Sequence, residues 1–178
     1  PKNMKSELIQ TLQFTKSIKL VDLSFRYSHK TPWVLNGANL EIPLGARVGF
    51  IGKTGGGKST LLDILMGLLP LQNGILSIDD IPINHTNLRA WQKNIAHVPQ
   101  SIFLSDTSIL ENIALGVENK YVDIPRLHEA VSKAELKYVV DNLSDGLETL
   151  VGERGVQLSG GQRQRIGIAR ALYKSPKV

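Results

Sequence analysis

The chain has 178 residues, of which 42% are hydrophobic and 21% charged, and this length and composition fit one globular domain with a sizeable core. It contains no cysteine, which excludes disulfides and thiolate zinc sites and suits the cytosol. The formal charge of +5 invites a nucleic-acid hypothesis, but the basic residues are dispersed. A solvated basic surface explains the balance, and we expect no nucleic-acid partner.

The N-terminal half is expected to hold most of the strands. Residues 1–16 predict a polar lead-in, which we interpret as a linker. Residues 18–27 alternate apolar and polar side chains, which is typical of a strand with one buried face. We expect that face to carry Val21, Leu23, Phe25 and Tyr27. Further strands are predicted at residues 38–42, 47–51, 74–79 and 95–98.

Helical patterns alternate with these strands and then dominate the second half. A helix is predicted at 59–66, closed by Pro70, and a short one at 87–93 has Thr86 as its expected cap. Ser108 and Glu111 fit a capping box for a helix that runs to Ala114. The remaining helices are expected at residues 126–134, 136–143 and 163–172.

A glycine-rich segment separates the predicted strand at 47–51 from the helix that follows it. It matches the P-loop pattern GxxxxGK[ST] at each fixed position and consists of Gly52, Lys53, Thr54, Gly55, Gly56, Gly57, Lys58 and Ser59. Glycines let the backbone turn and its amides approach phosphates, and a helix start favours anions. Lys58 adds a positive charge for the β and γ oxygens, and the Ser59 hydroxyl can ligate Mg²⁺.

The alternative for this segment is a glycine-rich turn with a chance lysine. Because an apolar run precedes the segment and a helical pattern follows it, the context favours a nucleoside triphosphate site. We extend this site to Thr60, the next residue of the helix.

A second motif, Leu158-Ser159-Gly160-Gly161-Gln162, begins about a hundred residues after the P-loop. Ser159 is expected to cap the helix that follows, the glycines keep the helix entrance open, and the first amides can bind an anion. Taken alone, the segment could equally be a plain capped helix. Together with the P-loop it resembles the signature sequence of ATP-binding cassette (ABC) ATPases.

The resemblance also implies roles for Tyr27 and Gln100. Tyr27 stands twenty-five residues before Gly52, where ABC ATPases carry the aromatic residue that stacks on adenine; the alternative is that it only completes a buried face. Gln100 matches the Q-loop glutamine, which contacts Mg²⁺ or the attacking water, although alone it could be a polar residue in a surface turn. The resemblance implies Lys58 and Gln100 as catalytic and Ser59 and Gln100 as Mg²⁺ ligands. The implied signature contacts to ATP are Ser159, Gly160, Gly161 and Gln162.

Two further stretches resemble the exporter branch of the family. Residues 149–155, Thr-Leu-Val-Gly-Glu-Arg-Gly, resemble a segment that contacts the coupling helices of exporters. Residues 100–113 resemble the exporter sequence after the Q-loop. Leu150 departs from the glutamate that is common at its position, so one carboxylate of that contact is missing, although Glu153 remains.

The resemblance covers residues 17–178 and implies an α/β fold. We expect a P-loop NTPase (RecA-like) core, an antiparallel β subdomain in the N-terminal half and an inserted helical subdomain at about residues 101–158. By resemblance the chain is the ATP-binding and ATP-hydrolysing domain of an ABC exporter, with ATP and Mg²⁺ as ligands. Its implied partners are a second nucleotide-binding domain, packed head to tail, and a transmembrane domain that places it at the cytoplasmic face of a membrane.

Some parts of the family pattern are missing from the sequence. No acidic pair follows an apolar run after the signature, and His97 precedes Gln100, on the wrong side of the signature for the switch histidine. We therefore expect a truncated chain that lacks the Walker B aspartate, the catalytic glutamate and that histidine. No apolar run approaches the roughly 18 residues that span a bilayer, so a membrane region is expected only in a partner segment.

Two alternatives stay open, a soluble ABC ATPase that acts on ribosomes or nucleic acid and an importer ATPase subunit. The DNA-repair type would place a long coiled coil between the two motifs, which the short spacing excludes. The ribosomal type and the importer subunit should both lack the exporter-like stretch before Leu158.

Overall fold

The computed structural model describes residues 12–178, apart from the side chain of Arg154. Most of the lead-in expected at residues 1–16 lies outside the described residues. The chain forms two compact units, one with the residues up to Ile95 together with Lys177, the other with residues 96–176 and Val178. Each unit buries its own hydrophobic core.

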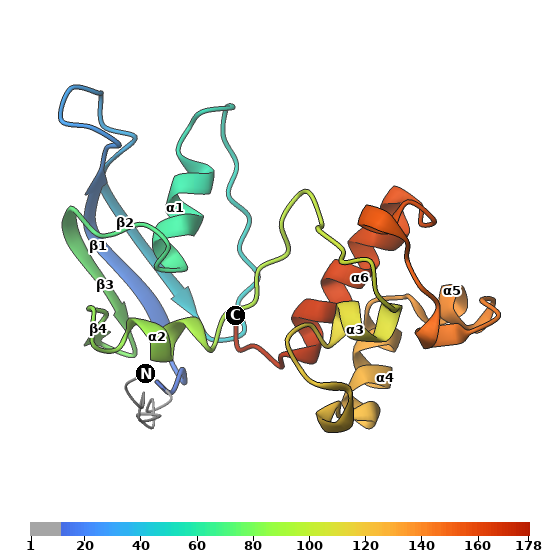
Figure 1. Cartoon of the computed structure of the whole chain (residues 1–178). Coiled ribbons are helices and arrows are strands. Elements are labelled where there is room, and N and C mark those ends of the chain that lie inside the picture. The colour runs from blue at the N-terminus through green and yellow to red at the C-terminus, as the bar shows by residue number, and fades with distance from the viewer. Residues whose placement is uncertain (1–11) are drawn as a thin grey trace, which may run out of the picture. The chain divides into compact units, whose positions relative to one another are not determined.

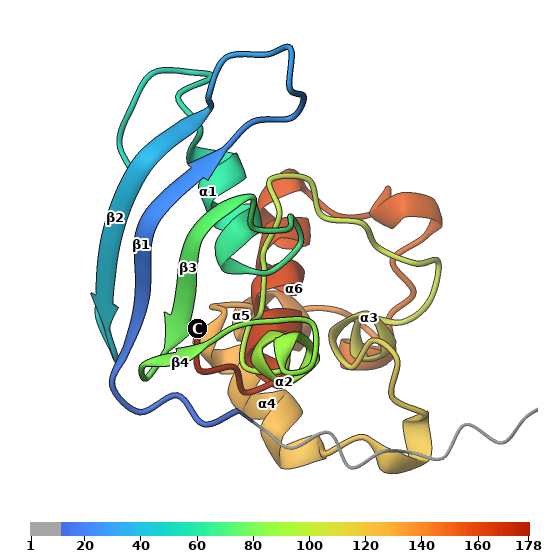
Figure 2. The ribbon, with the colours of Figure 1, turned by 90° about the vertical axis from the view of Figure 1, so that its left-hand side faces the viewer.

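The first unit is built on an antiparallel sheet. Its strands are β1 (Ser17–Phe25), β2 (Leu35–Pro43), β3 (Asn73–Ile78) and β4 (Ile81–Pro82), in the order β2-β1-β3-β4 (Figure 1). The helices α1 (Lys58–Leu65) and α2 (Leu88–Gln92) share the core of this sheet, and Figure 2 shows the strands side by side with α1 behind them. The antiparallel sheet expected in the N-terminal half is confirmed.

A bulge in β1 corrects its predicted buried face. The register of β1 shifts near Asp22 against both neighbouring strands, and Asp22 has a φ of 51°. The chain accommodates the bulge with glycine in β3, because a Cβ on Gly74 would lie only 2.6 Å from the Val21 carbonyl oxygen. An inserted residue reverses the alternation of a strand. Val21 is therefore 50% exposed while Leu20 and Leu23 are buried, and the prediction that Val21 belongs to the buried face is wrong.

Two predicted strands do not form. Residues 47–51 and 95–98 belong to no sheet in the described part of the chain. Repeated bonds to a neighbouring backbone stabilise a strand. Among residues 12–178, the segment at 47–51 makes no such bond, and the segment at 95–98 meets distant backbone through the Ala96 amide, which donates to the Val178 carbonyl oxygen at 3.0 Å, a single bond that makes no ladder. In the first segment Phe50 packs partly buried against the core of the first unit, whereas Val48 and Ile51 are exposed, Ile51 fully.

The predicted cap of α2 is also wrong. The Thr86 hydroxyl donates to Asn84 Oδ1 at 2.6 Å, which holds it in the preceding turn. The helix follows Asn87, whose side chain makes no cap hydrogen bond. An asparagine–threonine turn has replaced the expected threonine cap because both residues can bond locally to the backbone and to each other.

The second unit is helical and is organised around α6 (Gly160–Tyr173). The helices α3 (Ile109–Ile113) and α4 (Ile124–Lys133) pack against α6, and α5 (Lys137–Asp141) follows α4. Short 3₁₀ turns lie at η1 (Asn119–Tyr121), η2 (Gly146–Glu148) and η3 (Glu153–Gly155). Among residues 12–178, no helix has both the length and the apolar character needed to cross a membrane.

The capping box predicted at the start of α3 is confirmed. Ser108 Oγ accepts from the Glu111 amide at 3.2 Å, and the Ser108 amide donates to Glu111 Oε2, also at 3.2 Å. Both bonds satisfy amides that the helix itself cannot pair. The chain is thereby fixed at the point where it turns from the segment after Gln100 into the helical core.

Candidate nucleotide site

The P-loop leads directly into α1, and its glycines adopt conformations that other residues avoid. Gly55 and Gly57 have φ angles of 78° and 79°, in the left-handed region. Gly57 occupies the N-cap position of α1 and, as a glycine, contributes no side-chain hydrogen bond there. A Cβ at Gly57 would lie 3.0 Å from both the Val34 carbonyl oxygen and Leu35 Cδ2, at the start of β2. The loop therefore needs glycine here for its backbone angle and for its fit against β2.

Lys58 lies over the loop that precedes it. Its Nζ donates to the carbonyl oxygens of Gly52 at 2.9 Å and Lys53 at 2.8 Å. The Lys53 carbonyl also accepts from the Gly56 amide at 3.0 Å, which closes the turn of the loop. The ammonium is thus held at the loop by neutral acceptors. An anionic phosphate oxygen is a stronger acceptor for an ammonium than a carbonyl, so a polyphosphate can replace them.

The start of α1 supplies further groups for an anion. The amides of the first helical turn, which includes Lys58, Ser59 and Thr60, have no intrahelical partners. The turn contains no acidic residue, so no side chain neutralises the positive end of the helix dipole. Ser59 is exposed at this end. The P-loop and this turn together form a site suited to phosphates.

Tyr27 lies beside the same helix. The strand predicted to contain it ends at Phe25, so Tyr27 belongs to the loop after β1. The residue is 63% exposed, and its ring meets the Phe25 ring edge to face with the centroids 5.1 Å apart. Its hydroxyl hydrogen-bonds Thr60 Oγ1 at 2.9 Å. The structure thus brings Tyr27 to the first turn of α1, a contact that no sequence motif predicted.

The signature segment opens α6 as predicted. Ser159 Oγ accepts from the Gln162 amide at 3.2 Å, and the Ser159 amide donates to Gln162 Oε1 at 2.7 Å, so Ser159 is the N-cap in a reciprocal capping box. Gly160 and Gly161 are exposed, and the first turn contains no acidic residue. The open end of α6 therefore also suits an anion.

Arg163 fixes the approach to this helix. Its Nη1 donates to the carbonyl oxygens of Leu158 at 2.7 Å and Gly155 at 3.3 Å. These bonds tie the end of the exporter-like stretch to the signature. Sequence reasoning missed this role, and the only available signal was a basic residue one turn after the cap.

Gln100 is exposed and belongs to the second unit with the signature, whereas Tyr27 and the P-loop belong to the first unit. Residues 12–178 contain no cluster of three or more histidine or acidic side chains that could hold a metal ion by themselves. An Mg²⁺ ion that is bound together with a nucleotide takes most of its ligands from phosphates and water and only one or two from protein. The exposed Ser59 hydroxyl is a suitable ligand of that kind.

A buried polar cluster fastens the segment after Gln100 to α6. Asn112 is fully buried, and its side-chain amide donates to the carbonyl oxygens of Ser105 and Ser108, both at 3.0 Å. Arg170 of α6 donates from Nε to the Asn112 carbonyl oxygen at 2.8 Å, and burial lowers the pKa of Arg170. The arginine nevertheless stays charged near neutral pH. No sequence motif predicted this cluster.

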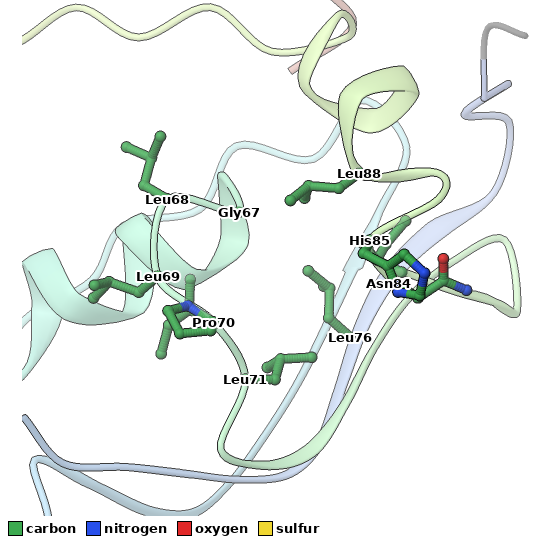
Figure 3. A pocket seen from close by; sticks show the side chains of 11 residues that line it. Gly67, Leu68, Leu69, Pro70, Leu71, Leu76, Asn84, His85 and Leu88 are labelled. Carbon is green, nitrogen blue, oxygen red and sulfur yellow. The ribbon is translucent and has the colours of Figure 1, made fainter. Parts of the chain in front are cut away.

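Each unit also carries a hollow in its surface. In the first unit an apolar pocket of about 520 Å³ lies between the end of α1, β3 and the start of α2, and Figure 3 shows Leu71, Leu76 and Leu88 around it. In the second unit a groove of about 610 Å³ is lined by residues 101–104 together with Glu153, Val156 and Arg163. The groove thus joins the segment after Gln100 to the exporter-like stretch.

A P-loop that opens a helix beside an antiparallel sheet, and a helical unit that carries a capped signature segment, define a P-loop nucleotide-binding domain. The sequence matches the ABC transporter family over residues 35–178. The chain therefore belongs to the ABC transporter family, and the identification made from the P-loop and the signature is confirmed.

Similar proteins belong to the same family. ABC transporter B family member 4 of Dictyostelium discoideum is 41% identical over 162 residues, which are 90% of this chain and 21% of that protein. The ATP-dependent lipid A-core flippase of Saccharophagus degradans is 39% identical over 161 residues, 90% of this chain and 27% of the flippase. A bacterial Atm1-family ABC exporter with ATP bound has a TM-score of 0.82 and 32% identity, over 91% of this chain and 28% of the exporter.

The chain thus spans about a quarter of the length of each of these three proteins. The likeness to the solved exporter covers nearly the whole chain at high structural similarity. It confirms the predicted P-loop NTPase fold class, with its antiparallel sheet and helical part.

Proposed function

We propose that this chain is the ATP-binding and ATP-hydrolysing domain of an ABC exporter, in which hydrolysis powers transport of a substrate across a membrane. The observation that carries the proposal is the P-loop, where Lys58 Nζ bonds two loop carbonyls at 2.9 and 2.8 Å at the start of α1. The exporter assignment is supported by the relatives, which include a lipid A-core flippase and an Atm1-family exporter. We expect the domain to work at the cytoplasmic face of the membrane.

In this proposal the first unit contacts both the phosphates and the base of the nucleotide. Lys58 exchanges its carbonyl acceptors for β- and γ-phosphate oxygens, and the amides of residues 55–60 surround the phosphates. The exposed ring of Tyr27 stacks on the base. Mg²⁺, held by Ser59 and Gln100 when bound, would neutralise charge on the phosphates. Gln100 orients the water that attacks the γ-phosphate.

The signature segment is proposed to serve the nucleotide of a second domain. In a head-to-tail pair, Ser159 and the amides of residues 160–162 would contact the γ-phosphate held by the partner's P-loop. The exposed glycines and the absence of acid at the start of α6 support this role, because the helix end can then receive an anion. The active site would be complete only in the pair.

The groove of the second unit is proposed to receive a coupling helix of the transmembrane domain. It combines exposed apolar side chains, Phe103 and Val156, with one charge of each sign, Glu153 and Arg163. Leu150, in the exporter-like stretch, is also exposed. An apolar contact surface of this kind with charges at its border fits a protein partner.

Calorimetric titration of the chain with MgATP tests the proposal. Lys58→Ala should abolish measurable binding, while Lys93→Ala, which removes an equal charge from an exposed site of the same unit, should leave it unchanged. Ser159→Arg should also leave binding to the single chain nearly unchanged but abolish ATP-dependent self-association in sedimentation experiments. If Ser159→Arg weakens binding as severely as Lys58→Ala, the two motifs form one self-contained site and the two-domain proposal is refuted.

A further inference from the structure

Tyr27 is an exposed residue outside any strand, yet its position is fixed by several contacts. It follows β1 by two residues and is 63% exposed. An aromatic side chain in such a loop would ordinarily sample several rotamers and lose that freedom when it stacks on a ligand. Two sets of hydrogen bonds at Tyr27 and its neighbour Arg26 oppose this freedom.

The first contact holds the backbone just before Tyr27. The Gln72 side chain accepts from the Arg26 amide at 2.9 Å through Oε1 and donates to the Arg26 carbonyl oxygen at 2.7 Å through Nε2. A side-chain amide thereby takes the place of a strand backbone. The last paired residues of β1 and β3 are Ser24 and Asn73, so Gln72 continues this pairing beyond the end of the ladder.

The second contact holds the far end of the side chain. The Tyr27 hydroxyl bonds Thr60 Oγ1 at 2.9 Å, and Thr60 is only 5% exposed. A threonine in a helix often bonds a carbonyl of the preceding turn, but here the hydroxyl is directed to the phenol. Because Thr60 lies in the first turn of α1, the bond ties the ring to the phosphate end of the site.

We infer that Gln72 and Thr60 are positioning residues that hold the Tyr27 ring ready for the base, at a fixed separation from the P-loop. The inference rests on the proposed role of Tyr27 as the residue that stacks on adenine. A ring that is ordered before binding loses less rotamer freedom on complex formation, so the affinity for ATP is higher. A ligand without a base gains nothing from this order.

The test compares MgATP with inorganic tripolyphosphate by calorimetry on the whole chain. Gln72→Ala should weaken ATP binding by roughly three- to tenfold, the range expected for lost hydrogen bonds, and leave tripolyphosphate binding unchanged. The matched control is Asn39→Ala. Like Gln72, Asn39 bonds backbone groups with both ends of its side-chain amide, but it does so away from Tyr27. It accepts from the Asp22 amide and donates to the Gly37 carbonyl oxygen, both at 3.0 Å. It should leave the affinity ratio of the two ligands unchanged.

Thr60 needs a second comparison because it also lies near the phosphates. Thr60→Val should weaken ATP binding in the natural chain but add nothing in a Tyr27→Phe background, where the phenol is already absent. Thr60→Ser, which keeps a hydroxyl, should restore the affinity. An equal loss in both backgrounds would show that Thr60 acts on phosphate directly and would overturn its positioning role.

Tyr27→Ala separates the inference from the function on which it rests. If this change leaves the ratio of ATP to tripolyphosphate affinity unaltered, the stacking role itself is refuted. If it lowers the ratio but Gln72→Ala behaves like Asn39→Ala, stacking stands and the positioning inference is refuted.

Discussion

Replacing Gly57 by alanine is expected to destabilise the first unit more than the same replacement at Gly55. The two residues have nearly equal φ angles, 79° and 78°, so alanine meets the same backbone strain at each. Their surroundings differ. A Cβ at Gly55 has no heavy atom within 4 Å, whereas at Gly57 it lies 3.0 Å from the Val34 carbonyl oxygen and 3.0 Å from Leu35 Cδ2. Comparing the two alanine variants therefore separates the cost of backbone strain from the cost of crowding around the added Cβ.

The magnitudes follow from these two terms. Left-handed backbone costs a residue with a Cβ about 1–2 kcal/mol, which is the whole expected loss for Gly55→Ala. Overpacking against a carbonyl oxygen and a side chain adds about 1–2 kcal/mol more at Gly57, because a backbone atom cannot turn aside. Gly57→Ala should therefore lower the free energy of unfolding by about 2–4 kcal/mol.

Urea unfolding followed by tryptophan fluorescence measures this loss. Both tryptophans, Trp33 and Trp91, belong to the first unit, and the Trp91 indole nitrogen donates to the Leu65 carbonyl oxygen at 2.8 Å, at the end of α1. The signal thus reports the unit that contains the P-loop. Equal losses for the two variants would refute the crowding argument, and no loss at Gly55 would refute the argument from backbone strain.

Two further predictions concern hydrogen-bonded side chains. Desolvation raises the pKa of Asp79, but hydrogen bonds from the Thr15 hydroxyl and from the amides of residues 15–17 lower it from 3.8 to about 2. Because the pKa is lower in the folded state, the ionised carboxylate stabilises the unit above pH ~4, and this stabilisation is lost as the pH falls toward ~2. Asp79→Asn should lower the free energy of unfolding by about 1–2 kcal/mol at neutral pH. Its stability, followed by tryptophan fluorescence, should change less between pH ~4 and ~2 than that of the natural chain. Asn112→Ala should cost the second unit about 2–4 kcal/mol, because it leaves buried partners of the amide unpaired. The Ser105 amide donates to Asn112 Oδ1 at 2.9 Å and should exchange its hydrogen faster in this variant. Far-ultraviolet circular dichroism measures the loss of stability, and unchanged exchange at the Ser105 amide would contradict the proposed role of the cluster.

The features that could be predicted from sequence are those determined by neighbouring residues. The capping box at Ser108 and the N-cap at Ser159 were predicted because a cap and the amide it pairs lie three residues apart. The P-loop was predicted for the same reason, since its glycines, lysine and serine are contiguous. The role of each residue in binding stays a prediction.

The features that were missed depend on distant parts of the chain. Val21 was assigned to the wrong face because the bulge in β1 is accommodated by Gly74, which is more than fifty residues away. The strands expected at 47–51 and 95–98 were predicted from apolar runs alone. An apolar run shows that a segment can pair, but a strand forms only where another backbone meets it.

The same distinction divides the proposed nucleotide site. Its phosphate end is a contiguous segment, residues 52–59, whereas its base end is assembled from the side chains of Tyr27, Gln72 and Thr60, which lie in separate segments. Changes within the loop should alter the binding of every polyphosphate, since each one uses Lys58 and the same amides. Changes at the base end should alter the binding only of those ligands that carry a base. The ratio of ATP to tripolyphosphate affinity therefore reports the part of the site that depends on tertiary structure, and that part was the least predictable from sequence.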